Sequence, residues 1–196
     1  MEAFELLVAA CDRARDETRV DVRPGVDFAA SEYFRDGRYH YRDRTVDTDG
    51  QRRFVEELVD RFGLVYVEDP FEEGSIDAFA ALTRSIGDRT TIVGDDVYVT
   101  QAARLREGIA RHASNAILIK VNQVGTLSAT LETVDLARQH RIATVTSHRS
   151  GDLPEGWLAH LAVASGAWGI KCGLLGGERV AKLNELLRLG RAAPQP

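Results

Sequence analysis

Short apolar runs alternate with longer amphipathic stretches along most of this chain. The runs predict six strands, over residues 22–27, 64–68, 91–94, 116–120, 143–146 and 168–171. Between them, apolar residues recur at helical spacing, which predicts helices over residues 2–15, 76–86, 100–112, 126–140, 155–165 and 177–189. Another helix ends at Phe62 and is capped by Asp47 or Asp49. Strands that alternate with helices are typical of βα units and a parallel sheet.

Segment 33–45 breaks this rhythm. Aromatic and charged residues alternate along it, as in Tyr33-Phe34-Arg35 and Arg38-Tyr39-His40. Such alternation predicts a hairpin or another excursion from the sheet.

Each of the six predicted strands ends at an ionisable residue or is followed by one within two positions. In chain order these residues are Asp27, Glu68, Asp95, Lys120, His148 and Lys171. In a (β/α) barrel the carboxyl ends of the strands build the active site, so residues far apart in the sequence converge there. Carboxylates can hold a hard divalent cation, and the bases can move protons beside it.

The choice of basic residues supports proton chemistry at two of these positions. Of the 25 basic residues only three are lysines, namely Lys120, Lys171 and Lys182. An amine loses its proton when it is desolvated or lies near another cation, whereas a guanidinium does not. Lysines at two strand ends therefore indicate either proton transfer or, as the alternative, two side chains whose stems simply cover apolar surface.

Composition sets further limits. A chain of 196 residues is predicted to fold as one domain, with a flexible tail over residues 190–196. The net charge of −5 does not favour binding to nucleic acid or to an anionic membrane, since both are themselves negatively charged. No apolar stretch approaches the ~20 residues of a spanning helix, and the start of the chain lacks a signal-peptide pattern. The two cysteines, Cys11 and Cys172, are too few for a disulfide framework, which favours a cytoplasmic protein.

Several longer motifs resemble the C-terminal barrel domain of enolase, and the resemblance covers residues 1–189 in order. The motifs are Val67-Glu-Asp-Pro-Phe71, Val93-Gly-Asp-Asp-Val-Tyr-Val-Thr100, Ile119-Lys-Val-Asn-Gln-Val-Gly125, Ser147-His-Arg-Ser-Gly151 and the helix Glu178–Arg188. Asp27–Phe34 resembles the family's first metal-ligand strand. The resemblance implies an α/β fold, a partial TIM-type (β/α) barrel of about six βα units.

The resemblance also implies a metal site. Asp27, Glu68 and Asp95 match the three carboxylates that hold the catalytic Mg²⁺. Three acids around one point repel one another without a cation, and Mg²⁺ prefers such oxygen ligands. Asp69 and Asp96 match supporting or loop residues rather than ligands.

The basic residues match the proton-transfer and substrate-binding groups of the family. Lys120 matches the general base that removes the proton at C2 of 2-phosphoglycerate, and Lys171 matches the lysine that stabilises the substrate carboxylate and the intermediate. His148 matches a substrate-contacting histidine. Arg149 and Ser150 match the phosphate-binding pair.

The chain also departs from the family pattern. Asp152-Leu-Pro-Glu-Gly156 and Cys172-Gly-Leu-Leu-Gly-Gly177 replace the usual loops that border the substrate pocket. Six strands are predicted, where a closed barrel has eight. The resemblance implies that the chain lacks the first two barrel strands and the N-terminal domain, and with them the acid that helps the hydroxyl leave. We therefore expect the chain to be a fragment, a subunit of a split enzyme or a relative that oligomerises. In each case we expect its partner to be a second copy of the chain or a complementing N-terminal enolase part.

The sequence thus predicts a lyase of the enolase type, which reversibly dehydrates 2-phosphoglycerate to phosphoenolpyruvate in glycolysis with Mg²⁺. Two alternatives stay open. One is an enolase-superfamily enzyme that acts on another phosphorylated or phosphonate substrate. The other is a non-catalytic enolase-like module that binds metal or partner proteins.

Overall fold

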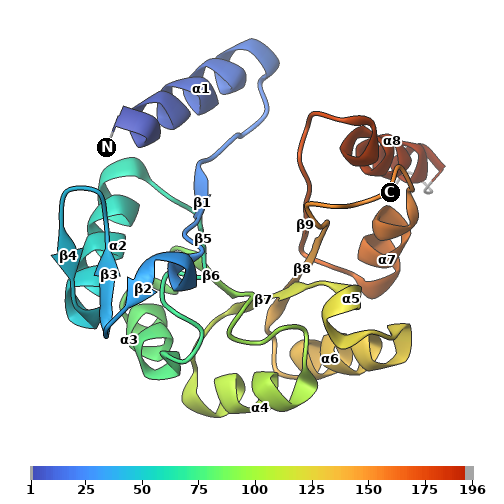
Figure 1. Ribbon diagram of the computed structural model, residues 1–196. Coiled ribbons are helices and arrows are strands. Elements are labelled where there is room, and N and C mark those ends of the chain that lie inside the picture. The colour runs from blue at the N-terminus through green and yellow to red at the C-terminus, as the bar shows by residue number, and fades with distance from the viewer. Residues whose placement is uncertain (1, 193–196) are drawn as a thin grey trace. The chain divides into compact units, whose positions relative to one another are not determined.

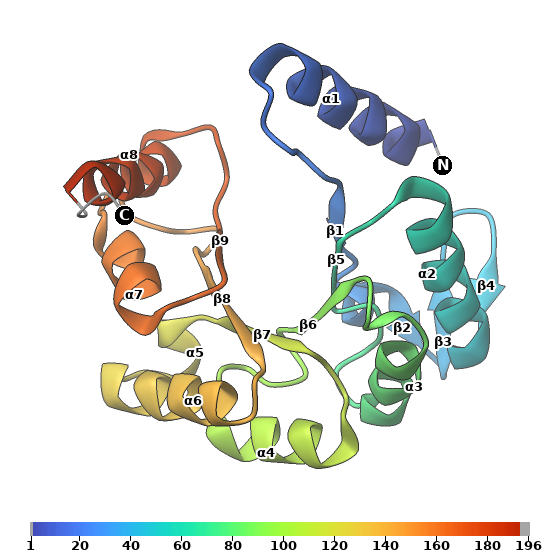
Figure 2. The same cartoon turned by 180° about the vertical axis from the view of Figure 1, so that it is seen from behind.

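The computed structural model describes residues 2–192, which fall into two compact units (Figures 1 and 2). The first unit runs to Val97 and includes Glu107–Asn115; the second comprises Tyr98–Arg106 and the chain from Ala116 onward. Each unit contains three parallel strands and the helices that follow them. The predicted α/β class with six βα strands is confirmed.

The first unit carries the strands that end in acids. Its helices and strands are α1 (Glu2–Thr18), β1 (Gly25–Asp27), the 3₁₀ turn η1 (Ala30–Tyr33), β2 (Phe34–Arg35), β3 (Arg38–His40), β4 (Thr45–Val46), α2 (Thr48–Phe62), β5 (Tyr66–Glu68), α3 (Ile76–Ile86) and β6 (Thr91–Gly94). β5 pairs in parallel with β1 on one side and β6 on the other, and Asp27 lies opposite Glu68. Apolar side chains such as Val67 and Ile92 are fully buried and form the core.

The predicted excursion is a small antiparallel sheet of β2, β3 and β4, which lies beside α2 (Figure 1). Tyr39 of β3 is completely buried and contacts the rings of Phe34 and Phe71 at centroid distances of 4.7 and 6.5 Å. Its hydroxyl accepts the N–H of Glu72 at 3.2 Å. The excursion is therefore fixed to the loop that follows β5.

The second unit carries the strands that end in bases. Its elements are the start of α4 (Ala102–Arg111, which ends in the first unit), β7 (Ala116–Ile119), α5 (Val121–Val124), α6 (Leu127–Gln139), β8 (Ala143–Ser147), α7 (Trp157–Ser165), β9 (Gly169–Lys171) and α8 (Gly177–Ala192). β8 pairs in parallel with β7 and β9. The helix α6 packs on β7 and β8, and α7 packs on β8, β9 and α8 (Figure 2).

Local signals explain several element boundaries. Asp47 caps α2 by accepting the N–H of Gly50 at 2.8 Å, and Gly63 ends that helix with φ of 63°. The sequence left Asp47 and Asp49 open as caps, and the structure selects Asp47. β1 begins at Gly25, later than predicted, because Pro24 has no N–H to donate to a ladder.

Two further details differ from the sequence-based prediction. The short helix α5 was not predicted. The last helix, α8, runs to Ala192, so the first three residues of the predicted tail are helical, while residues 193–196 lie outside the described part of the chain. Within residues 2–192, no helix combines the length and the apolar character that a membrane crossing requires.

Candidate active site

The acidic residues of the first unit meet at the carboxyl ends of β1, β5 and β6. The strand register places Asp27 opposite Glu68, and Glu68 opposite Val93, two residues before Asp95. Glu68 and Asp95 are buried, at 0% and 5% exposure, whereas Asp27 is exposed. Two buried carboxylates on neighbouring strands are costly unless cations or hydrogen-bond donors compensate their charge.

Two hydrogen bonds orient these acids. The Tyr66 hydroxyl donates to Oε2 of Glu68 at 2.5 Å, and the N–H of Ala29 donates to Oδ1 of Asp27 at 3.0 Å. Burial and the charge of Glu68 raise the pKa of Tyr66 above its ordinary value, so the tyrosine stays a proton donor. Glu68 and Asp27 are therefore held as hydrogen-bond acceptors at the strand ends.

Asp69 organises the loop that follows β6. Its Oδ1 accepts the N–H of Asp95 and its Oδ2 accepts the N–H of Asp96, each at 2.9 Å. Burial raises the pKa of Asp69 to about 8, with the charges of Asp95 and Asp96 adding to the rise and their two N–H donors opposing it. Asp69 thereby fixes the backbone from which Asp95 projects.

The carboxylate oxygens of Asp69, Asp95 and Asp96 lie within 4.8 Å of one another, the one such acidic cluster in residues 2–192. It shares only Asp95 with the predicted ligand set of Asp27, Glu68 and Asp95, which stays a prediction. Because both oxygens of Asp69 already accept backbone N–H groups, Asp69 acts as a support for its neighbours. All donors in this region are oxygens, which is the donor type that a hard divalent cation prefers.

Lys120 follows β7 in the second unit and is held through Thr100. The backbone N–H of Lys120 donates to Oγ1 of Thr100 at 2.9 Å, and that hydroxyl donates to Oε1 of Gln123 at 2.7 Å. The carbonyl of Thr100 accepts the hydroxyl of Thr133 at 2.8 Å. Thr100 was not predicted from the sequence to support the site, although it closes the motif Val93–Thr100.

His148 and Lys171 lie side by side at the ends of β8 and β9. Ser147 pairs with Lys171 in the register, and the N–H of His148 donates to the carbonyl of Lys171 at 3.1 Å. Ile119, just before Lys120, pairs with Thr146, two residues before His148. The three predicted proton-transfer and substrate-contacting residues thus stand at the ends of three adjacent strands.

The surroundings of His148 are strongly cationic. Burial and the charges of Arg179, Lys171 and Lys182 lower the pKa of His148, and Asp152 opposes the shift. Its Nδ1 is buried and has no hydrogen-bond partner within residues 2–192. A neutral imidazole among several cations suits the binding of an anion.

Arg149 and Ser150 follow directly and are both exposed. The Nη1 of Arg149 donates to Oδ1 of Asn122 at 3.0 Å, and its backbone N–H donates to Oδ2 of Asp152 at 3.3 Å. Arg149, Asn122, Ser147 and Asp152 line a cavity of about 280 Å³. The predicted phosphate-binding arginine therefore opens onto a cavity large enough for a small ligand, beside the ends of β7 and β8.

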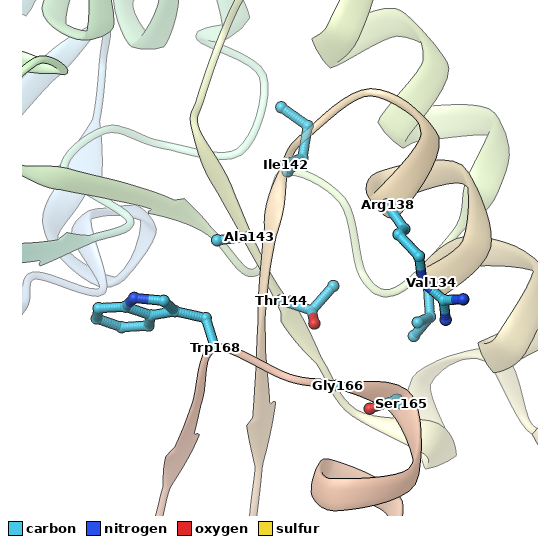
Figure 3. A pocket seen from close by; sticks show the side chains of 8 residues that line it. All are labelled: Val134, Arg138, Ile142, Ala143, Thr144, Ser165, Gly166 and Trp168. Carbon is cyan, nitrogen blue, oxygen red and sulfur yellow. The ribbon is translucent and has the colours of Figure 1, made fainter. Parts of the chain in front are cut away.

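A smaller cavity, of about 100 Å³, lies at the opposite ends of β8 and β9 (Figure 3). Val134 and Arg138 of α6 lie on one side of it and Trp168 on the other, with Thr144 of β8 between them (Figure 3). Since barrel chemistry takes place at the carboxyl ends of the strands, this cavity is separate from the candidate active site.

Comparison with known proteins agrees with this arrangement. The family "Enolase, C-terminal TIM barrel domain" matches residues 1–193. The enolase of Methanothermobacter thermautotrophicus is 49% identical over 197 residues, which cover 98% of this chain and 47% of the relative. The enolases of Natronomonas pharaonis and Halorubrum lacusprofundi are each 48% identical, over 96% of this chain and 47% and 48% of their own lengths.

This chain therefore spans about half the length of the curated relatives that it matches. The predicted fold, a partial TIM-type barrel with six βα units, is confirmed. The chain belongs to the enolase family, and it is similar to the C-terminal barrel part of those enzymes.

Proposed function

We propose that this chain provides the metal-binding and base-carrying part of a cytoplasmic, enolase-type lyase, which reversibly dehydrates 2-phosphoglycerate to phosphoenolpyruvate. The observation that carries the proposal is the placement of Lys120, His148 and Lys171 at the ends of three adjacent parallel strands. The family membership supports the same activity. Full turnover requires the remaining half of an enolase, which would supply the acid for the departing hydroxyl.

A divalent cation fits the acidic strand ends. Asp27, Glu68 and Asp95 would hold Mg²⁺, because their oxygens are the donor type that it prefers and two of them are buried. When bound, the cation neutralises charge that develops on the substrate carboxylate. Asp69 would support this site by fixing the N–H groups of Asp95 and Asp96.

The basic residues would divide the remaining work. Lys120 takes the proton from C2, and Lys171 stabilises the negative charge that accumulates on the substrate carboxylate. His148, neutral and beside Lys171, contacts the substrate. Arg149, which lines the 280 Å³ cavity, and the adjacent Ser150 bind the phosphate, since a guanidinium and a hydroxyl both match phosphate oxygens.

Complementation tests the activity. We expect at most a trace of phosphoenolpyruvate from the chain alone, measured by its ultraviolet absorbance, and turnover once the N-terminal part of a relative is added. Lys120→Ala should lower the restored rate by roughly 10²–10⁴-fold, because it removes the positioned base. Arg191→Ala, on the exposed side of α8, should leave it unchanged. Full activity of the isolated chain, or restored activity that ignores Lys120, contradicts the proposal.

Metal binding is tested separately by thermal melts with and without Mg²⁺. A cation that binds the native state raises stability by RT ln(1 + [L]/Kd), about 2.7 kcal/mol at 100 times Kd. Mg²⁺ should raise the melting midpoint of wild type and of Asp43→Ala, the control at an exposed carboxylate. It should not raise the midpoint of Asp95→Ala. A wild-type midpoint that Mg²⁺ leaves unchanged rules out the site.

A different phosphorylated or phosphonate substrate is the second candidate. It is favoured by the altered loops over residues 152–156 and 172–177, where Leu174 and Leu175 are 75% and 84% exposed in place of the usual polar turn. Rates of the complemented enzyme on 2-phosphoglycerate and on phosphonate analogues distinguish the two. A higher kcat/KM for an analogue selects the second candidate.

A further inference from the structure

Lys182 is a buried charge for which the proposed mechanism has no use. It lies in α8 and its side chain is 0% exposed, unlike the exposed Arg188 and Arg191 of the same helix. Burying an ammonium costs several kcal/mol unless partners compensate it. Its partners therefore indicate what this charge does in the fold.

Those partners join α8 to the loop that follows β8. The Nζ of Lys182 donates to the carbonyl of Leu153 and to that of Glu178, both at 2.8 Å. It also forms an ion pair with Oδ2 of Asp152 at 3.4 Å. Two of the three contacts thus reach residues about 30 positions away, in loop 148–156, which carries Arg149 and Ser150.

Asp152 passes this restraint to the predicted phosphate-binding residues. Its carboxylate accepts the N–H of Arg149 at 3.3 Å and that of Leu153 at 2.9 Å. The far end of the loop is also closely packed on α8, because a Cβ at Gly156 would lie 2.8 Å from Cγ of Glu185. The loop backbone between these points has little freedom while Lys182 holds Asp152 and Leu153.

The side chain of Arg149 is restrained at its other end by Asn122, whose Oδ1 accepts Nη1 at 3.0 Å. The guanidinium is therefore placed over the 280 Å³ cavity by one side-chain contact and by the Asp152 contact to its backbone. Loss of the backbone contact would let the arginine leave the cavity rim without unfolding β8.

We propose that Lys182 is a positioning residue that orders loop 148–156 through Asp152 and Leu153 and so presets Arg149 for an anionic, phosphate-bearing ligand. The proposal deepens the proposed function and rests on its phosphate site. Lys182 touches no ligand itself. The proposal places its main effect on phosphate binding in the position of Arg149, besides the contribution of its charge to the surroundings of His148.

Lys182→Met keeps the length of the stem and removes the charge, and Arg191→Met makes the same change at an exposed position of α8. Binding of inorganic phosphate to the full chain is followed by NMR, and amide exchange is measured at Arg149 and Leu153. We expect phosphate affinity to fall about 10-fold in Lys182→Met, as in Arg149→Ala, and no further in the double variant. Exchange at the two amides should speed up about 10-fold, with little change in β7 and β8. Arg191→Met should resemble wild type.

The outcomes distinguish a failure of the positioning role of Lys182 from a failure of the proposed phosphate site. Unchanged affinity in Lys182→Met, or a double variant whose losses add, overturns the positioning role, because an additive loss means that Lys182 acts independently of Arg149. If wild type binds no phosphate, the phosphate site of the proposed function fails. In that case, faster amide exchange in Lys182→Met that is confined to Arg149 and Leu153 still supports the ordering of the loop by Lys182. Unchanged exchange at both amides overturns that ordering role.

A second variant covers the case in which Lys182→Met does not fold. Asp152→Asn neutralises the partner of Lys182 and leaves a single carbonyl oxygen, which can accept the N–H of Arg149 or that of Leu153 but not both. Asp152→Asn should lower phosphate affinity, as Lys182→Met does. In a chain that already carries Arg149→Ala, it should cause no further loss. Full wild-type affinity in Asp152→Asn overturns the proposal.

Discussion

At the scale of single residues, Thr100 shows how one hydroxyl can hold Lys120, the proposed general base. It accepts the N–H of Lys120 and donates to Gln123, while its own backbone has φ of 57°. Thr100→Val keeps the branched shape and removes only the hydroxyl, which leaves the Lys120 N–H without this acceptor. We expect a loss of about 1–3 kcal/mol in the free energy of unfolding, measured with urea.

The same variant should lower kcat of the complemented enzyme more than it raises KM, because it displaces the base and leaves the phosphate site intact. Thr45→Val, at an exposed position of β4, is the matched control and should change neither quantity. An unchanged kcat in Thr100→Val would mean that Lys120 is positioned by other contacts.

His148 predicts a pH dependence. Its pKa lies below the ordinary 6.5, chiefly through burial and the nearby charge of Arg179, with Lys171 and Lys182 contributing and Asp152 opposing. The native state therefore binds fewer protons than the unfolded chain, so stability should fall as the pH drops through about 6.5. His148→Gln should flatten this fall between pH 7.5 and 5.5 in urea unfolding, whereas the exposed control His140→Gln should not. Equal slopes in wild type and His148→Gln contradict the prediction.

At the scale of elements, the N-terminus of α2 offers a clean comparison between two neighbouring acids. Asp47 accepts the N–H of Gly50, whereas Asp49 is exposed and lies 3.7 Å from Arg52. Asp47→Ala should cost about 1 kcal/mol, because it removes the cap. Asp49→Ala should cost only a few tenths, since exposed pairs are weak. Urea unfolding measures both, and a larger loss in Asp49→Ala would reverse the choice of cap.

The elements also show what the sequence could and could not predict. The strands could be predicted because a strand that is buried on both faces needs a short, continuous apolar run. Ala116–Ile119 is such a run, and all four of its residues are buried in the structure. The helix α5 was missed because Val121-Asn-Gln-Val124 is a single turn, too short to show a period. The position of Glu68 and Lys171 at strand ends could be predicted, since each closes such a run; their role in a site stays a prediction.

The supporting contacts of the site could not be predicted. Asp69 bonds to N–H groups 26 and 27 residues away, and Thr100 to an N–H 20 residues away. Lys182 ends no strand and matches a helix motif, so nothing local indicates its burial or its contact with Leu153, 29 residues earlier. Such roles arise from tertiary register, which a pattern along the chain does not encode.

At the scale of the whole molecule, the unpaired edges of β1 and β9 predict self-association. In the part of the chain that the structure describes, β1 pairs only with β5 and β9 only with β8. An open edge presents N–H and C=O groups that need partners. Exposed apolar side chains also flank β9 in the sequence, namely Trp168 at 61% directly before it and Leu175 at 84% in the loop after it.

We therefore expect a dimer or larger species in light scattering of the isolated chain, or else poor solubility, because either state buries the edges. Addition of the N-terminal part of a relative should dissolve that assembly if this part covers the same edges. Hydrogen exchange of any monomer should show β1 and β9 as the least protected of the six parallel strands. A soluble monomer at high concentration, with both edges strongly protected from exchange, would mean that the edges are already covered. The chain would then need no partner to cover them.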